Sequence, residues 1–245
     1  MSRNIKIFFL LFLLATGAAA QDPLKSLPKN YRLEFENEWV KVVRVHYGAR
    51  EKIAAHDHAE WGTAYVYLND AGPVIFRHIG LSYGAITRPA VKAGSFRLYK
   101  SVREVHEVEN PSDTPSDFLR VEFKTEPVNE KSLHGKFHRE SAFEPAQPAK
   151  IQFENEQVRV TRLLLAPGAK LAIAAGAEPA LLVALTEAKL RARSLAMGQT
   201  RWIAAKKEET LENAGAAPIE LLRFDLRTPP AKARPADPAH KHPHD

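Results

Sequence analysis

The chain contains two copies of one sequence block, and this repeat constrains its fold more than any other feature. Phe35-Glu36-Asn37-Glu38 recurs as Phe153-Glu154-Asn155-Glu156, and the segments that follow each copy, 40–45 and 158–163, also agree. Two closing segments, 118–125 and 221–228, match in the same order. Blocks that recur in a fixed order are typical of a duplicated structural unit.

Each copy is rich in short candidate strands. Runs of β-branched and aromatic residues are separated by turn signals such as Asn69-Asp70-Ala71-Gly72 and Asn110-Pro111-Ser112-Asp113. In the first copy the candidate strands cover residues 40–47, 63–68, 74–79, 95–99, 102–108 and 118–123. Residues 180–195 favour a helix by composition, but the repeat predicts two strands joined at Thr186-Glu187-Ala188. The pattern predicts an all-β fold of antiparallel sandwiches or barrels.

The two ends of the chain are expected to lie outside these units. Residues 1–20 combine Arg3 and Lys6 with an apolar run and end in three alanines, which predicts a cleaved signal peptide. An uncleaved anchor is the alternative. We therefore expect a secreted or periplasmic protein with no membrane span in its mature chain. Residues 229–245 are rich in proline, alanine and lysine, which predicts disorder.

Composition narrows the class of partner. The chain has 35 Lys and Arg against 29 Asp and Glu, and the basic residues are scattered among acidic ones. No basic stripe with interleaved aromatic residues is found, so we expect no nucleic-acid partner. Cysteine is absent, which excludes disulfides and thiolate metal ligands.

The expected units are residues 21–125 and 150–228, joined by a polar linker at 126–149, in a monomer or a homodimer.

A histidine-rich motif in the first unit predicts a metal site. In an extended strand His56, His58 and Glu60 point the same way, and His106 adds an imidazole from another strand. Imidazole and carboxylate ligands without sulfur suit Mn, Fe, Zn, Ni or Cu. Glu60 could be a metal ligand itself, or it could accept a hydrogen bond beside three histidine ligands. The alternative to a metal site is that His56 and His58 are ordinary strand histidines near the surface.

These residues resemble the bicupin group of the cupin superfamily over residues 31–125 and 150–228. The family motif is a glycine, a spacer, His-x-His, three or four residues, then Glu; here Gly48 precedes by a longer spacer, and Glu60 follows His58 after one residue. The Glu60-Trp61 pair looks like the oxalate-decarboxylase branch. The second family motif survives as His106 and Asn110. The resemblance implies two consecutive cupin-like barrels, each a double-stranded β-helix or jelly roll.

The second unit has lost the candidate ligands. Alanines and Gly176 stand where the histidines should be, Glu209 replaces His106, and only Glu178 remains as a candidate ligand. We therefore expect the second unit to be a structural copy. His240, His242 and His244 alternate in the C-terminal tail and offer another metal-binding tract, although a solvated tail is the simpler reading.

Two functions from different classes follow. The first is a metal-dependent enzyme acting on a small organic acid or similar oxygenated metabolite, which the resemblance implies. The second is a non-catalytic barrel of the cell envelope that binds a small ligand or serves as structure. His46 and His78 are further candidate imidazoles. The residues expected to line the barrel mouth are Trp61, Tyr65, Tyr67, Phe96, Arg97 and Tyr99.

Overall fold

The computed structural model of the protein describes residues 22–80, 82, 84–100, 104–129, 132–139, 147–174 and 176–232. The expected signal peptide and the three tail histidines lie outside these residues. The described chain is almost entirely antiparallel β-structure, as predicted, with one short helix, α1 (Pro23–Ser26). No helix among the described residues is long and apolar enough to span a membrane.

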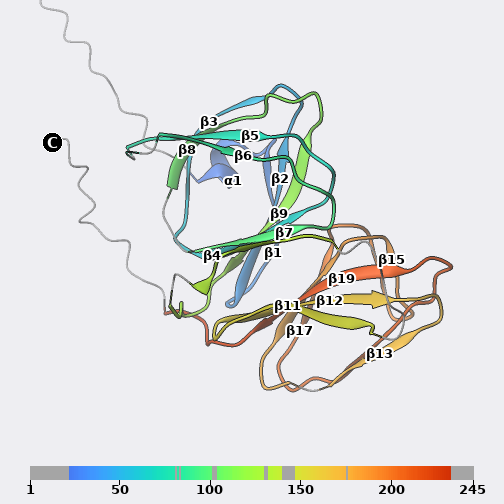
Figure 1. The fold of residues 1–245 in the computed structure, drawn as a ribbon. Helices are drawn as coiled ribbons and strands as arrows, with labels where there is room; N and C mark the ends of the chain where they lie inside the picture. Colours follow the sequence, from blue (N-terminus) through green and yellow to red (C-terminus); the bar gives the residue numbers. More distant parts are fainter. Residues whose placement is uncertain are drawn as a thin grey trace, which may run out of the picture.

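The first unit is a sandwich of two sheets (Figure 1). Its larger sheet has the order β1-β2-β9-β4-β7-β10, and its smaller sheet has the order β3-β8-β5-β6. The larger sheet comprises β1 (Tyr31–Glu36), β2 (Val40–Tyr47), β9 (Ser116–Phe123), β4 (Gly62–Tyr67), β7 (Phe96–Tyr99) and β10 (Gly135–Phe137). The smaller comprises β3 (Lys52–His58), β8 (Glu104–Glu109), β5 (Val74–His78) and β6 (Ala85–Arg88).

The second unit repeats the strand order of the larger sheet. Its main sheet has the order β11-β12-β19-β14-β17, and it also contains two two-stranded sheets, β13-β18 and β15-β16. The main sheet comprises β11 (Ala149–Glu154), β12 (Val158–Leu165), β19 (Ile219–Leu226), β14 (Ala180–Ala184) and β17 (Thr200–Ile203). The short sheets comprise β13 (Lys170–Ile173), β18 (Glu209–Glu212), β15 (Ala188–Lys189) and β16 (Ser194–Leu195). The segment 180–195 is therefore not helical: it contains β14, β15 and β16, one strand more than the two that the repeat predicted, and the first connection spans residues 185–187.

The two large sheets pack face to face over a shared apolar core. Val42, Val66 and Phe123 from the first unit belong to the same buried cluster as Val160 and Phe224 from the second. Strands β4 and β14 are consequently buried on both faces, which explains the unbroken apolar sequence of β14 and the absence of charged residues from β4. Removing this interface would expose the apolar faces of both sheets, so the two units stabilise each other.

The two halves also share their local irregularities. The β1–β2 register shifts between Leu33 and Phe35, and the β11–β12 register shifts between Ile151 and Phe153. Asn110 Nδ2 donates to the carbonyl oxygens of Gly48 and Thr114, and the corresponding Asn213 donates to those of Leu165 and Ala217. Asn110 thus closes a turn, as expected from its neighbouring proline.

The segment expected to be a linker is partly structured. Within 126–149, β10 pairs with β7 at the edge of the first unit's larger sheet. Phe137 stacks on Phe96 with 4.6 Å between ring centroids, and Leu133 is 2% exposed. These apolar contacts order a segment whose sequence has no clear period.

Candidate metal centre

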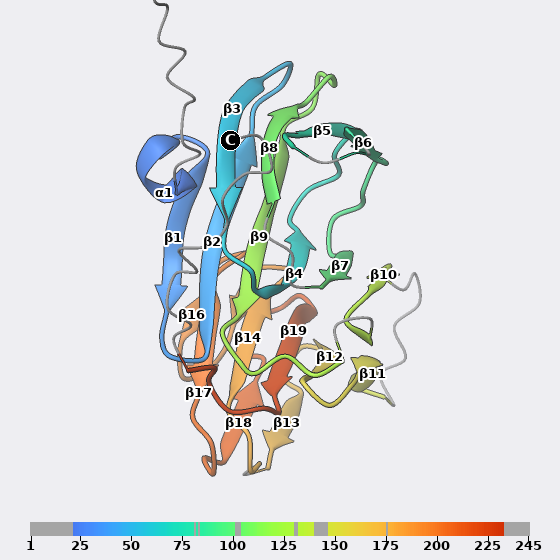
Figure 2. The same ribbon diagram turned by 90° about the vertical axis from the view of Figure 1, so that its left-hand side faces the viewer.

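The three histidines of the sequence motif meet on the inner face of the smaller sheet. His56 and His58 lie on β3, and His56 is the direct cross-strand partner of His106 on β8 (Figure 2 shows the two strands side by side). Their ligand atoms all lie within 4.8 Å of one another. His56, His58 and His106 are 0%, 7% and 3% exposed, so the cluster is shielded from bulk water.

Burial and nearby positive charge keep His56 and His58 neutral. Burial, with His106 next, lowers the pKa of His56 from 6.5 to about 4. Burial, with the Arg120 guanidinium next, holds the pKa of His58 well below 6.5. A neutral imidazole has a lone pair for a metal ion, whereas an imidazolium has none.

The hydrogen bonds of His56 fix its tautomer. Nδ1 lies 2.9 Å from the carbonyl oxygen of Ala54, which only accepts, so Nδ1 carries the proton and Nε2 carries the lone pair. Ligand histidines are oriented in this way by a carbonyl acceptor in many metal sites. The donor set therefore fits a divalent ion bound by three imidazoles.

A buried tyrosine pair completes the surroundings of the cluster. The Tyr31 hydroxyl lies 2.7 Å from His56 Nε2 and donates to it, and the Tyr47 hydroxyl lies 3.0 Å from that of Tyr31. Burial raises the pKa of Tyr47 to about 12 and that of Tyr31 well above 10, so both remain protonated. In this structure the phenol of Tyr31 thus occupies the His56 lone pair.

The other candidate ligands lie elsewhere. Strand β3 ends at His58, so the alternation that would direct Glu60 inward stops before it, and Glu60 is exposed and outside the cluster. His46 lies on the opposite face of β2, where its Nδ1 is 2.7 Å from Asp117. His78 is the cross-strand partner of His106 on its other side, with 5.5 Å between ring centroids, and lines the adjacent pocket.

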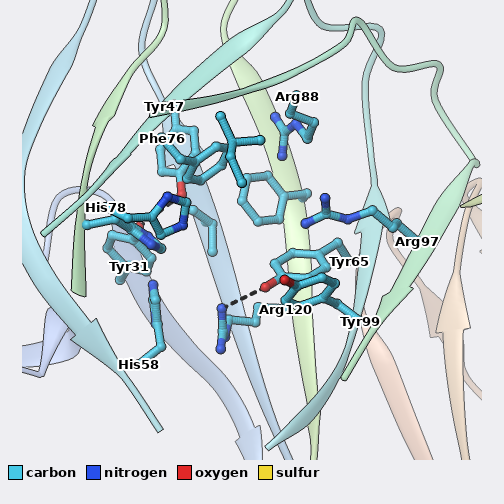
Figure 3. Close-up of a pocket in the computed structure, with 14 residues that line it drawn as sticks. Tyr31, Tyr47, His58, Tyr65, Phe76, His78, Arg88, Arg97, Tyr99 and Arg120 are labelled. Atoms are coloured by element: carbon cyan, nitrogen blue, oxygen red, sulfur yellow. Dashed lines mark hydrogen bonds between the residues drawn. The ribbon is translucent and has the colours of Figure 1, made fainter. Parts of the chain in front are cut away.

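A pocket of about 160 Å³ lies beside the histidines, between the two sheets of the first unit. Figure 3 shows His58, His78 and Tyr31 on one side of it and Arg88 and Arg97 on the other. The remaining lining is mostly aromatic or apolar: Val45, Tyr47, Tyr65, Phe76, Ile86, Tyr99, His106, Phe118 and Arg120.

Three of the residues expected to line the barrel mouth do so: Tyr65, Arg97 and Tyr99. Phe96 does not, because neighbours on a strand face opposite ways; it belongs instead to the shared core. Tyr67 and Trp61 are not among the residues that line the pocket. Tyr67 is buried next to it, in contact with Phe118 and Arg88, and Trp61 is half-buried immediately before β4.

Three pocket residues outside the histidine motif differ in chemistry from their counterparts in the second unit. Tyr31, Tyr47 and Phe118 hold the places that Ala149, Leu165 and Leu221 hold in the second unit, as the strand registers show. The interior of the second unit is aliphatic, with Leu163, Leu182 and Ile219 in its buried cluster. The positions that are aromatic in the first unit and aliphatic in the second thus lie at the pocket of the first unit.

The second unit does not hold a corresponding cluster. Ile173 faces Glu209 where His56 faces His106, and Glu209 forms an ion pair with Arg201. Among the described residues, the three histidines of the first unit form the one group with metal-ligand geometry, and Glu178 is not part of it.

No protein-family profile and no curated protein sequence matches the chain. Several solved structures are similar to it. The nickel(II) complex of the bacterial pirin YhhW from Escherichia coli superposes with a TM-score of 0.57 at 15% identity, covering 81% of this chain and 90% of that one. YhaK from E. coli gives a TM-score of 0.55 at 13% identity, with coverages of 85% and 98%. This chain has the fold of the cupin superfamily.

Salicylate 1,2-dioxygenase from Pseudoaminobacter salicylatoxidans, in an adduct with gentisate, is another similar structure. It superposes with a TM-score of 0.54 at 11% identity, covering 77% of this chain and 68% of that one. At these identities the cupin likeness concerns the fold.

Proposed function

We propose that this protein binds one divalent metal ion at His56, His58 and His106 and acts there on a small organic acid or similar oxygenated metabolite. The observation that carries the proposal is the buried cluster of three imidazoles, whose ligand atoms lie within 4.8 Å of one another and of which His56 and His58 have lowered pKa values. The nickel(II) in the YhhW structure and the gentisate in the dioxygenase structure support it by analogy of fold.

The bound ion would act as a Lewis acid on an oxygen of the ligand. The residues of the chain would hold the three imidazoles, exclude water and orient the ligand against the aromatic wall. Mn, Fe, Zn, Ni and Cu all accept nitrogen ligands of this kind. Three protein ligands leave positions open for a ligand or water, as in catalytic metal sites.

A second candidate is a barrel that binds a small ligand without chemistry. It is favoured by the hydrogen bond from Tyr31 to His56 Nε2, which satisfies that nitrogen without any metal. In either case we propose export to the periplasm or the exterior, supported by the sequence of residues 1–20, and a monomer or homodimer. The mass of the mature chain and light scattering test these two points.

Metal analysis of the purified full chain tests the main proposal. We expect one equivalent of a transition metal in the wild type and in His46→Ala, whose imidazole lies outside the cluster. We expect none in His58→Ala. Truncation after Pro230 should leave the stoichiometry unchanged. Substoichiometric metal that is unaffected by His58→Ala would exclude the site, and loss on truncation would assign the metal to the tail histidines.

A further inference from the structure

The pocket wall opposite the histidines carries a buried cation that no acidic side chain among the described residues neutralises. Arg88 is 3% exposed, and its guanidinium makes one hydrogen bond to a described residue, from Nη2 to the hydroxyl of Ser116, 3.1 Å away. Its Nε and Nη1 atoms are buried and have no hydrogen-bond partner. A buried charge with free donors is strongly unfavourable unless a ligand or counter-ion meets it.

The other two buried arginines among the described residues each pair with a carboxylate. Arg120 donates from Nε to Glu122, 2.6 Å away, and Arg162 forms an ion pair with Glu220. Arg162 also donates to the carbonyl oxygen of Gly94 in the first unit, so its donors too meet acceptors. Among the three arginines that are buried in the described chain, Arg88 is the exception, and it is the one placed directly at the pocket with free donors.

Aromatic rings hold the Arg88 guanidinium in place but do not satisfy its donors. Its central carbon lies 5.1 Å from the ring centroid of Tyr67, 5.3 Å from that of Phe118 and 5.7 Å from that of Phe76. Such cation–π contacts stabilise the charge through the faces of the rings. The in-plane N–H groups still require an acceptor, and a carboxylate is the acceptor whose geometry suits a guanidinium best.

A second guanidinium lies on the same wall. Arg97 is half-buried over Tyr65, 4.7 Å from the ring centroid, and beside Tyr99, and its Nε is also buried without a partner. Figure 3 shows Arg88 and Arg97 on the side of the pocket away from His58 and His78. The pocket therefore has two guanidinium groups without acidic partners among the described residues at one end and aromatic rings in its body. Its other end is lined by imidazoles and by Arg120, whose charge is paired with Glu122.

We propose that Arg88 and Arg97 bind the carboxylate of a small ligand whose flat apolar body packs on the tyrosine and phenylalanine rings. The volume of about 160 Å³ limits this body to about a single ring or a short chain, since a cavity of roughly 150 Å³ holds benzene. The assignment names the substrate class and rests on the proposed function only in directing the far end of the ligand toward the metal-binding histidines.

Calorimetric titration of the metal-free full chain with benzoate tests the assignment. Benzamide has the same shape without the charge, and inorganic phosphate is an anion without the apolar body. We expect benzoate to bind in preference to both probes. Because a charge-assisted hydrogen bond is lost, Arg88→Gln and Arg97→Gln should each weaken benzoate binding about ten- to a hundredfold. Arg77→Gln, on the neighbouring β5 and paired with Glu109, is the matched control and should bind as the wild type.

Thermal unfolding and metal content of each variant separate the outcomes. Benzoate binding that is unchanged in folded Arg88→Gln and Arg97→Gln would overturn the assignment, as would equal binding of benzamide or tighter binding of phosphate. Absence of benzoate binding at millimolar concentration would overturn it too. If Arg88→Gln fails to fold, Arg97→Gln decides. Wild-type protein that binds benzoate but no metal would refute the proposed function and leave the carboxylate site standing.

Discussion

Acid should destabilise the metal-free protein through His56, and the size of the effect follows from its burial. The pKa of this imidazole is 6.5 in the unfolded chain and about 4 in the folded protein. Below pH 6.5 the unfolded chain therefore binds a proton that the folded protein does not. The stability that depends on neutral His56 is therefore fully present above pH 6.5 and is lost progressively as the pH falls toward 4.

The fall of the His56 pKa from 6.5 to about 4 corresponds to roughly 3.5 kcal/mol in all, of which roughly 2.5 kcal/mol is lost between pH 7.5 and pH 4.5. That is a substantial part of the free energy of unfolding of a typical domain, about 5–15 kcal/mol. With a urea dependence of about 2 kcal/mol per molar, the unfolding midpoint should fall by about 1.2 M. Because carboxylates titrate in the same range, the measurement is the difference between wild type and His56→Gln.

Urea unfolding followed by tryptophan fluorescence, with chelator present, at pH 7.5 and pH 4.5 is the assay. His56→Gln should lose less stability than the wild type between these values. His46→Gln, which changes a partly exposed imidazole outside the buried cluster, is the control. Equal acid sensitivity of the wild type and His56→Gln would refute the claim that this imidazole is held neutral by burial.

Three further perturbations test separate parts of the structure. Tyr31→Phe removes the hydroxyl that occupies His56 Nε2, so zinc affinity measured by competition should rise about two- to tenfold; a fall would mean that the phenol assists binding. Leu181→Ala opens the shared core and should cost about 2–5 kcal/mol in a single calorimetric transition; two transitions would mean that the barrels unfold independently. Asn110→Ala removes five hydrogen bonds and should cost about 1–3 kcal/mol by urea unfolding; a change below about 0.5 kcal/mol would contradict its turn-closing role.

The repeat and the alternation of side chains were enough to predict the fold and the three histidines. The matching blocks specified two all-β units, and period-two alternation placed His56 and His58 on one face of a strand. The same rule gave the wrong result for Glu60, because it holds only while the chain stays extended, and β3 ends at His58. It also separates Phe96 from Tyr99, which cannot share a face of β7.

The pocket chemistry was harder to predict because it depends on contacts between distant strands. Nothing near Tyr31 in the sequence shows that its hydroxyl reaches His56, since the contact forms only when β1 and β3 enclose the same barrel. Arg88 follows a segment with weak strand signals, and its lack of a carboxylate partner is a property of the packed structure. Aligning the two halves would have marked Tyr31, because the second unit has Ala149 at that place.

X-ray absorption of the full chain loaded with one equivalent of zinc tests the central claim most directly. The account predicts a spectrum with three imidazole ligands at about 2.0–2.1 Å, the usual zinc–nitrogen distance. It also predicts that this signature disappears in His58→Ala and persists in His46→Ala. A spectrum with fewer than three imidazoles, or one that is unchanged in His58→Ala, would contradict the assignment of the metal to the buried cluster of His56, His58 and His106.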